Sequence, residues 1–181
     1  MKHILSSLAC AAALCGAGPA QAVLVNFDPG TKVLVEIDNV TGATRYDEAG
    51  YRFAAPGLAF SPLDGVGTAG SDALFLLAGS EINFAAVNGG PFILSGLDYS
   101  GNLLIEGYVG GVNTLSQSLV SANALTHYDF SPSWSSLSSV VFRVNADSVI
   151  DSISAIPEPA SWALAALGLL GMAVGSRRRS V

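Results

Sequence analysis

Cysteine is nearly absent from this sequence. The 181 residues contain two, Cys10 and Cys15, and both lie close to the N-terminus. If that segment is removed during export, the remaining chain cannot form a disulfide, so its fold must depend on a packed core. Residues 23–155 are long enough to bury such a core without covalent crosslinks.

Basic residues are scarce as well. Residues 23–155 hold four of them against thirteen acids, which leaves a formal net charge of −9, more acidic than the −6 of the whole chain. Phosphate backbones repel a chain of this charge. We therefore expect no nucleic-acid partner.

Groups that commonly perform catalysis are also few. His127 is the only histidine after the N-terminal segment, and no G-x-S-x-G nucleophile motif is present. One histidine without cysteine supplies too few ligands for the usual zinc sites. We expect His127 to lie on a strand surface and the protein not to be an enzyme. A hydrolase that uses Glu36 or Asp38 stays as a less favoured alternative, because glycosidases need two carboxyl groups across a cleft.

The N-terminus has the pattern of a secretory signal peptide. Lys2 precedes the apolar stretch 4–16, Gly18-Pro19 breaks any helix, and Ala20-Gln21-Ala22 forms an A-x-A cleavage site. We expect a signal helix over residues 1–22, export through the Sec translocon and cleavage after Ala22. A lipoprotein signal fits less well, because Leu14 precedes Cys15.

The central region, residues 23–155, is predicted to be all-β. It contains no convincing helical period, and short apolar or alternating runs recur between Gly, Ser, Asn, Asp and Pro. Val140, Phe142 and Val144 alternate with Val141, Arg143 and Asn145, as in an antiparallel strand with one wet face. The pattern predicts an antiparallel, jelly-roll-like β-sandwich. The predicted strands are 32–38, 73–77, 81–87, 92–99, 102–109, 114–120, 125–130, 138–144 and 148–154. We expect a hairpin between 73–77 and 81–87, and a turn at Ser100-Gly101.

The C-terminal segment, residues 156–181, combines a proline pair, an apolar run and a cationic end. Residues 160–175 carry no charge, and at ~1.5 Å per residue they would form a helix of about 24 Å. Arg177, Arg178 and Arg179 supply the positive flank typical of the cytoplasmic side. The sequence predicts a transmembrane helix that holds the exported precursor in the inner membrane.

The order and spacing of this tail resemble the PEP-CTERM sorting signal of Gram-negative bacteria, also called the ice-binding-protein C-terminal domain. The resemblance covers Pro157-Glu158-Pro159, the apolar helix and the arginine cluster. It implies recognition by an exosortase, a membrane transpeptidase that cuts near the Pro-Glu-Pro. An ordinary single-span anchor is the alternative. Ice binding is not expected, because the chain has no repeated Thr-x-Thr ladder.

The central region is similar to small β-sandwich domains of PEP-CTERM proteins, which look like galactose-binding or carbohydrate-binding jelly rolls. The similar stretches are 89–101, 105–111, 130–142 and 150–153. Aromatic side chains can stack on sugar rings, so Trp134, Tyr108 and Tyr99 are candidate ligand contacts, with packing in the core as their alternative role. Polysaccharide is accordingly a candidate partner.

Two further motifs concern ions and cofactors. Gly65-Val66-Gly67-Thr68-Ala69-Gly70 matches G-x-G-x-x-G, but Pro62 precedes it and a strand-like run follows, so we expect a loop and not a dinucleotide site. No cofactor is expected to be required. Asp28, Asp38 and Asp151 are candidate oxygen ligands for a structural calcium ion.

These observations lead to one favoured hypothesis. The chain would be an exported protein without catalytic activity, anchored in the inner membrane as a precursor and sorted by an exosortase to the cell surface or the extracellular space. There we expect it to associate with exopolysaccharide or biofilm. The alternative is a carbohydrate-binding module.

Overall fold

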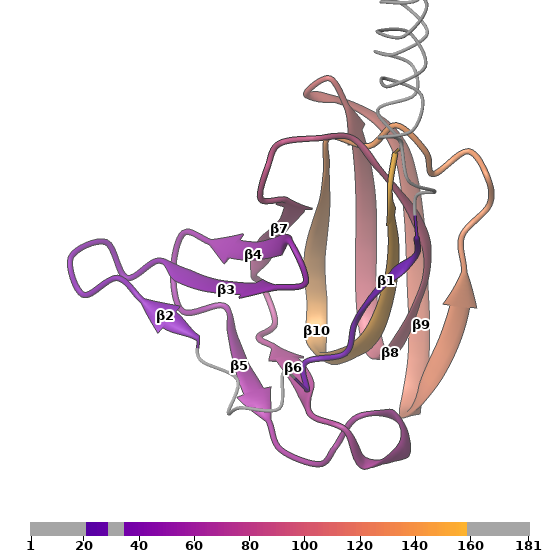
Figure 1. Ribbon diagram of the computed structural model, residues 1–181. Coiled ribbons are helices and arrows are strands. Elements are labelled where there is room, and N and C mark those ends of the chain that lie inside the picture. The colour runs from indigo at the N-terminus through magenta and orange to yellow at the C-terminus, as the bar shows by residue number, and fades with distance from the viewer. Residues whose placement is uncertain (1–20, 29–34, 159–181) are drawn as a thin grey trace, which may run out of the picture. The chain divides into compact units, whose positions relative to one another are not determined.

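A computed structural model describes residues 21–28 and 35–158, and residues 21–157 form one unit (Figure 1). The described residues contain ten strands and one short 3-10 helix, so the all-β, antiparallel prediction is confirmed. The predicted signal helix and transmembrane helix lie outside the described residues, apart from Gln21 and Ala22. Within the described ranges, no helix has the length and apolarity needed to cross a membrane. The elements are β1 (Val23–Val25), β2 (Glu36–Ile37), β3 (Thr44–Glu48), β4 (Tyr51–Ala55), β5 (Phe60–Leu63), η1 (Thr68–Gly70), β6 (Ala73–Leu76), β7 (Glu81–Ala86), β8 (Phe92–Val109), β9 (Val112–Asp129) and β10 (Ser139–Pro157).

Strand β10 is the centre of the sheet. One of its edges pairs with β8 along almost the whole strand, and β8 pairs in turn with β9. The other edge pairs with three strands in succession: first β7, then β6 and finally β1. The sheet then continues from β7 through β4 and β3 to β2, and from β6 to β5.

The three long strands bend, and this bend makes the sheet a sandwich. The pairing register shifts between residues 144 and 149 of β10, between 99 and 101 of β8, and between 121 and 126 of β9. Bulges of this kind turn a strand locally and increase its twist. Each long strand joins two runs that the sequence predicted as separate strands. That part of the prediction is wrong: the Gly, Ser, Asn and Asp residues at these points mark bulges inside strands instead of turns between them.

Gly101 lies at the bend of β8, where any other residue would be strained. Its φ is 102°, a backbone conformation that residues with a Cβ rarely adopt. A Cβ on Gly101 would also lie 2.2 Å from Ser148 Oγ and 2.7 Å from the Asp147 carbonyl oxygen. The predicted turn at Ser100-Gly101 is therefore a bend inside β8, where Gly101 lies tightly against the bulge of its partner strand β10.

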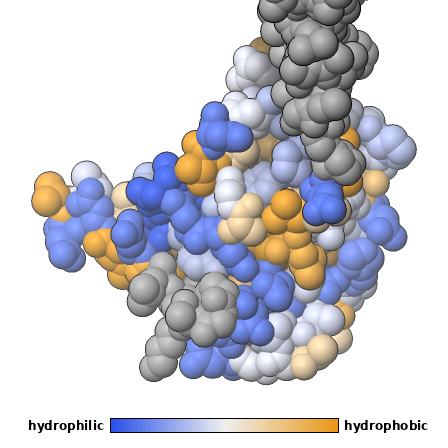
Figure 2. All heavy atoms as spheres, viewed as in Figure 1, coloured by the Kyte–Doolittle hydropathy of each residue, from blue (hydrophilic) through white to orange (hydrophobic). Residues whose placement is uncertain are grey.

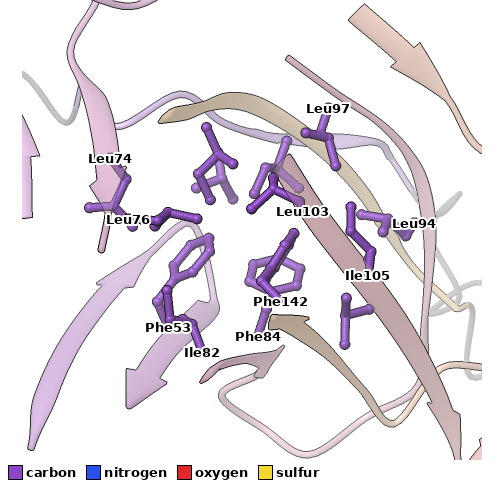
Figure 3. Close-up of a cluster of buried hydrophobic side chains, with 14 of the residues drawn as sticks. Phe53, Leu74, Leu76, Ile82, Phe84, Leu94, Leu97, Leu103, Ile105 and Phe142 are labelled. Carbon is purple, nitrogen blue, oxygen red and sulfur yellow. The ribbon is translucent and has the colours of Figure 1, made fainter. Parts of the chain in front are cut away.

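Side chains from both sides of the bend share one core. Leu94 and Leu97 precede the bend of β8, Leu103 and Ile105 follow it, and all four are fully buried. Figure 3 shows them close to Phe53, Phe84 and Phe142, which come from β4, β7 and β10. The Phe53 and Phe84 rings lie 4.8 Å apart between centroids, and both are within 6.4 Å of the Phe142 ring. The inward-facing residues predicted at the start of β10 (Val140, Phe142 and Val144) are buried as expected.

The predicted hairpin between residues 73–77 and 81–87 does not form. Strands β6 and β7 lie on the same edge of β10 and pair with different stretches of it, Ser148–Ile150 and Val140–Arg143. The loop between them crosses the bend of β10: the Gly79 N–H donates to the Val144 carbonyl over 2.7 Å. The bend therefore separates two strands that are neighbours in sequence.

Candidate functional site

The beginning of the Pro-Glu-Pro segment is part of the folded sheet. Strand β10 continues to Pro157, two residues beyond the predicted end of the domain, and Ile156 and Pro157 lie opposite Ile93 and Phe92 of β8. Ala155 is fully buried between Leu94 of β8 on one side and Val23 of β1 on the other. Pro157 itself is exposed. Pro159 and Arg177–Arg179 lie outside the described residues.

Strand β1 brings the predicted signal-cleavage site to the same place. Val23, the first residue after the predicted cut, lies opposite Ala155, and Val25 lies opposite Ile153. Ala22 is exposed, whereas Ala20 lies outside the described residues. Because the two strands are antiparallel, the start of β1 at Val23 and the end of β10 at Pro157 lie at the same end of the sheet. The two predicted processing positions, about 130 residues apart in sequence, are neighbours in the fold.

The segment that follows β1 is held from inside the domain. Phe27 is fully buried against Tyr46 and Phe53, and its backbone has a positive φ of 56°. The Phe27 N–H donates to Glu48 Oε2 over 3.0 Å, and the Tyr46 hydroxyl donates to the same oxygen over 2.9 Å. Burial raises the pKa of Glu48, and these two hydrogen bonds offset part of that rise. Glu48 therefore ties the chain after β1 to strand β3.

Two of the three aromatic candidates for ligand binding are buried. Trp134 is 4% exposed and packs on Phe130, with 4.6 Å between the ring centroids, and Tyr99 is 6% exposed. The serines around Trp134 suggested an exposed loop, but the Leu94 N–H donates to the Trp134 carbonyl and closes this loop onto β8. As the molecule is folded, the Trp134 and Tyr99 rings have little surface to offer a sugar. Only Tyr108 is half-exposed.

Tyr108 lies in a polar group of side chains on the outer face of β8, β9 and β10. Arg143 donates to Glu106 Oε2 over 2.7 Å and pairs with Glu81, while the Asn113 amide donates to Glu106 Oε1 over 2.9 Å. The pKa of Arg143 is raised, first by its hydrogen bond to Glu106 and in smaller part by Tyr108. A half-exposed aromatic ring beside a guanidinium, carboxylates and an amide can both stack and hydrogen-bond. The sequence did not reveal this group, because Glu106 and Arg143 are 37 positions apart.

His127 is on a strand, as predicted, and carboxylates contact both of its ring nitrogens. Nδ1 lies 2.6 Å from Asp98 Oδ1, and Nε2 lies 3.2 Å from Asp129 Oδ1. The hydrogen bond to Asp98 is the main cause that raises the pKa of His127, whose side chain is 54% exposed. The second Asp98 oxygen accepts the Thr68 hydroxyl over 2.6 Å. This arrangement holds the imidazole between two carboxylates.

The G-x-G-x-x-G stretch closes over a buried carboxylate, not over a phosphate. Asp151 is fully buried, and its Oδ2 accepts the Thr68 N–H over 2.6 Å and the Ser71 hydroxyl over 3.1 Å. The Ser152 N–H donates to the other oxygen. Strand β6, and not a helix, follows this loop, as predicted. A Cβ on Gly67 would lie 2.7 Å from Asp151 Oδ2, so the glycine permits this close approach.

The three candidate calcium ligands are not brought together. Asp38 caps a turn by accepting the N–H groups of Val40 and Thr41, which lowers its pKa, whereas Asp28 is exposed after β1. Asp151 is fully buried and accepts the three hydrogen bonds just described. Over residues 21–28 and 35–158, no group of three or more acidic, histidine or cysteine side chains is arranged to hold a metal ion.

The carboxylates considered for a hydrolase lie on and after the short strand β2. Glu36 is exposed and faces Arg45, with 4.0 Å between Oε2 and the guanidinium, while the backbone N–H groups of its turn occupy Asp38. Arg45 and Arg52 both bind Asp47, and the hydrogen bond from Arg52 is the main cause that lowers the Asp47 pKa. The structure therefore places Glu36 and Asp38 in an ion-paired, solvent-facing hairpin.

The family comparison identifies the C-terminal segment. Residues 155–179 match the PEP-CTERM protein-sorting motif, which begins inside strand β10 as described above. The chain thus carries this sorting motif after an all-β domain. No curated protein is significantly similar to the chain.

Solved structures similar to the chain include carbohydrate-binding modules. A family 29 module has a TM-score of 0.39 at 11% identity over 77% of this chain and 89% of its own. TmCBM61, solved with beta-1,4-galactotriose, has a TM-score of 0.37 at 10% identity over 74% of this chain and 99% of its own. Ectoine synthase from P. lautus has a TM-score of 0.25 at 11% identity, over 67% of this chain and 72% of its own. At these scores the similarity indicates no ligand for this chain.

Proposed function

We propose that this chain is an exosortase substrate: an exported, non-catalytic β-sandwich protein that is anchored in the inner membrane as a precursor and then delivered to the cell surface or the extracellular space. The match of residues 155–179 to the PEP-CTERM motif carries this proposal. In it, residues 1–22 direct export through the Sec translocon, Pro157, Glu158 and Pro159 are recognised by the exosortase, and Arg177–Arg179 hold the cytoplasmic end. The chemistry of sorting belongs to the exosortase.

The domain itself would then serve as the delivered part, in contact with exopolysaccharide. The contacts of His127 favour a structural role for the most catalytically versatile side chain in the domain, because both ring nitrogens face carboxylates. The acidity of residues 23–155 favours uncharged or cation-bridged polysaccharide over nucleic acid.

Intact-mass spectrometry of the protein from its native host tests the proposal. The cell envelope and the medium are analysed separately. We expect a chain that begins at Val23 and has lost Arg177–Arg179, with or without added glycan mass. A chain that keeps these arginines and stays in the membrane fraction would make the segment an ordinary anchor and overturn the exosortase assignment.

A variant pair makes the test specific for the motif. We expect Glu158→Ala to accumulate as the uncut precursor, whereas Glu36→Ala, which removes an exposed acid elsewhere, is processed like the natural chain. Equal processing of both variants would contradict recognition of the Pro-Glu-Pro segment.

Carbohydrate binding is the second candidate function, and the outer face around Tyr108 is the observation that favours it. The ring would stack on a sugar, and Glu106, Asn113 and Arg143 would hydrogen-bond its hydroxyl groups. We expect Tyr108→Ala to abolish binding on a glycan array of secreted polysaccharides, while Val120→Ala, on the outer face of β9, leaves it intact. Absence of binding by the natural domain to any such polysaccharide would remove this candidate.

A hydrolase is the least favoured candidate. It would show turnover on a panel of glycosides and esters, and this turnover would fall in Glu36→Ala or Asp38→Ala. Absence of turnover by the natural chain on the whole panel would exclude it.

A further inference from the structure

The matched sorting motif overlaps the folded domain by three residues. The match starts at Ala155, while β10 ends at Pro157. Ala155 is fully buried, and strands on both sides pair with it: Leu94 of β8 on one side and Val23 of β1 on the other. The first three residues of the matched motif are therefore held in the sheet.

Strand β1 is the smaller of the two partners that hold this end of β10. It has three residues, and β10 is the one described strand with which it pairs, whereas β8 pairs with β10 from Ser139 to Pro157. Leu24 of β1 faces outward and is 52% exposed. The attachment of β1 therefore depends on buried Val25, on buried Phe27 and on the hydrogen bond from the Phe27 N–H to Glu48. A short edge strand with few anchors opens more readily than the long strands of a core.

We propose that pairing in the sheet restricts the C-terminal cut of this chain to the Pro157–Glu158 bond and the bonds after it: β8 pairs with β10 as far as Pro157, and strand β1 adds to this protection by covering residues 153–155 on the other edge. This inference rests on the proposed exosortase processing for its biological meaning, but the protection itself is a property of the domain. Detachment of β1 would free one edge of residues 153–155. A processing enzyme could then pair with that edge as an added strand.

The chemistry explains why pairing in the sheet blocks the cut. Cleavage breaks the amide C–N bond; the acyl carbon takes the oxygen of water or the heteroatom of another nucleophile, and the leaving nitrogen takes a proton. The nucleophile must approach the face of the carbonyl, and the enzyme must grip several residues before the scissile bond in an extended form. In the closed sheet, β8 and β1 already flank Ala155. Cutting before Pro157 therefore requires local opening, and its rate follows the population of the open state.

A reversible crosslink tests the role of β1. Leu24 and Ser154 lie opposite each other in the pairing of β1 with β10 and both point outward, so Leu24→Cys/Ser154→Cys can form a disulfide without entering the core. The full-length chain carries Cys10→Ala and Cys15→Ala in every arm. It is dissolved in detergent and treated with proteinase K, and product masses locate the cuts.

We expect the natural sequence to be trimmed to products that end at Pro157 or later. Cutting before Pro157 should be slower by about tenfold or more in the oxidised crosslinked variant than after its reduction. Glu36→Cys/Arg45→Cys, an opposed and exposed pair between β2 and β3, is the matched control and should leave that rate unchanged. Equal rates in the oxidised and reduced β1 variant would overturn the role of β1.

A loosening variant tests the same idea in the other direction. Glu48→Ala removes the acceptor of the Phe27 N–H, and we expect cuts after Ile153 or Ala155 to become about tenfold faster. Tyr46→Phe removes only the other hydrogen bond to Glu48 and should leave these cuts slow. Products of the natural chain that end before Pro157 and form as fast as later ones would contradict the proposal.

The host experiment separates this inference from the proposed function. If the tail is never removed in the native host, the exosortase assignment fails, but the proteinase K results still measure the protection by β1. If the tail is removed and the mature chain ends before Pro157, exosortase processing stands and the present inference fails.

Discussion

His127 and Asp98 connect strands β9 and β8 through a contact of 2.6 Å between Nδ1 and Oδ1. This contact raises the pKa of His127 in the folded protein above its ordinary value near 6.5, with a smaller contribution from Asp129. A histidine with a raised folded pKa stabilises the fold fully below its unfolded pKa. The stabilisation is lost as pH rises through the folded pKa. Because the side chain is more than half exposed, solvent weakens the effect.

We therefore expect His127→Gln to lower the melting temperature at about pH 5.5 and to change it much less at about pH 9. Thermal unfolding followed by circular dichroism at both pH values measures the difference. Asp129→Asn serves as a control, because it removes the longer contact and should have the smaller effect at low pH. A loss of equal size at both pH values would show that the contact acts by packing and not by charge.

Asp151 provides a second prediction. Its two oxygens receive two N–H donors and one hydroxyl donor, and the residue is fully buried. Asp151→Asn places an amide NH2 against these donors, so at least one buried group loses its partner. We expect a loss of about 1–3 kcal/mol in the free energy of unfolding, measured in urea.

The loop over Asp151 should respond in the same variant. The Thr68 N–H and the Ser71 hydroxyl no longer have a carboxylate acceptor, so we expect faster hydrogen exchange at residues 65–72. Asp38→Asn, whose partners belong to an exposed turn, is the control and should leave that loop unchanged. Unaltered exchange at Thr68 in Asp151→Asn would contradict the role given to the buried carboxylate.

Local sequence patterns predicted the strands but not their joins. Period-two alternation identified the inward face of Val140, Phe142 and Val144. A strand with one buried face alternates apolar and polar residues, so this face can be predicted from a short stretch of sequence. Whether Ser100-Gly101 or Asn145–Asp147 makes a turn or a bulge depends on the partner strand. Gly101 lies against Ser148, which is 47 positions later in the sequence, so no local pattern indicates this partner. The pattern therefore predicted which residues are extended, but it wrongly divided each of the long strands β8, β9 and β10 in two.

The candidate site also has one part that the sequence predicted and one part that it did not. The sorting motif is a continuous stretch, so the sequence alone identified it, and residues 155–179 match it. The partners of His127, Arg143 and Asp151 come from distant strands, and nothing close to these residues in the sequence points to them. Trp134 shows the opposite error: its serine neighbours resemble an exposed loop, but hydrogen bonds to β8 turn the indole inward.

The packing of the aromatic core predicts how much Phe142 contributes to the free energy of unfolding. Phe142 is fully buried and packs with Phe53 and Phe84. Phe142→Ala removes most of the ring and leaves a cavity between the layers, so we expect a loss of about 3–5 kcal/mol in the free energy of unfolding. Val120→Ala, at a valine that is 69% exposed, should change it by about 0.5 kcal/mol or less. Urea denaturation of both variants measures the contrast, and similar losses would contradict the assigned core.

Gly101 provides the sharpest test of the bend in β8. In Gly101→Ala the new Cβ meets Ser148 Oγ at 2.2 Å and the Asp147 carbonyl oxygen at 2.7 Å, on a backbone with a φ of 102°. Gly42 also has a positive φ, 71°, but a Cβ there would have no neighbour within 4 Å, so Gly42→Ala carries the backbone strain alone. We expect Gly42→Ala to cost about 1–2 kcal/mol and Gly101→Ala clearly more, measured as free energies of unfolding in urea. Ser148→Gly should not rescue Gly101→Ala, because the backbone oxygen of Asp147 remains in place. Full rescue would mean that β8 and β10 lie less tightly together at this bulge than the sheet register implies.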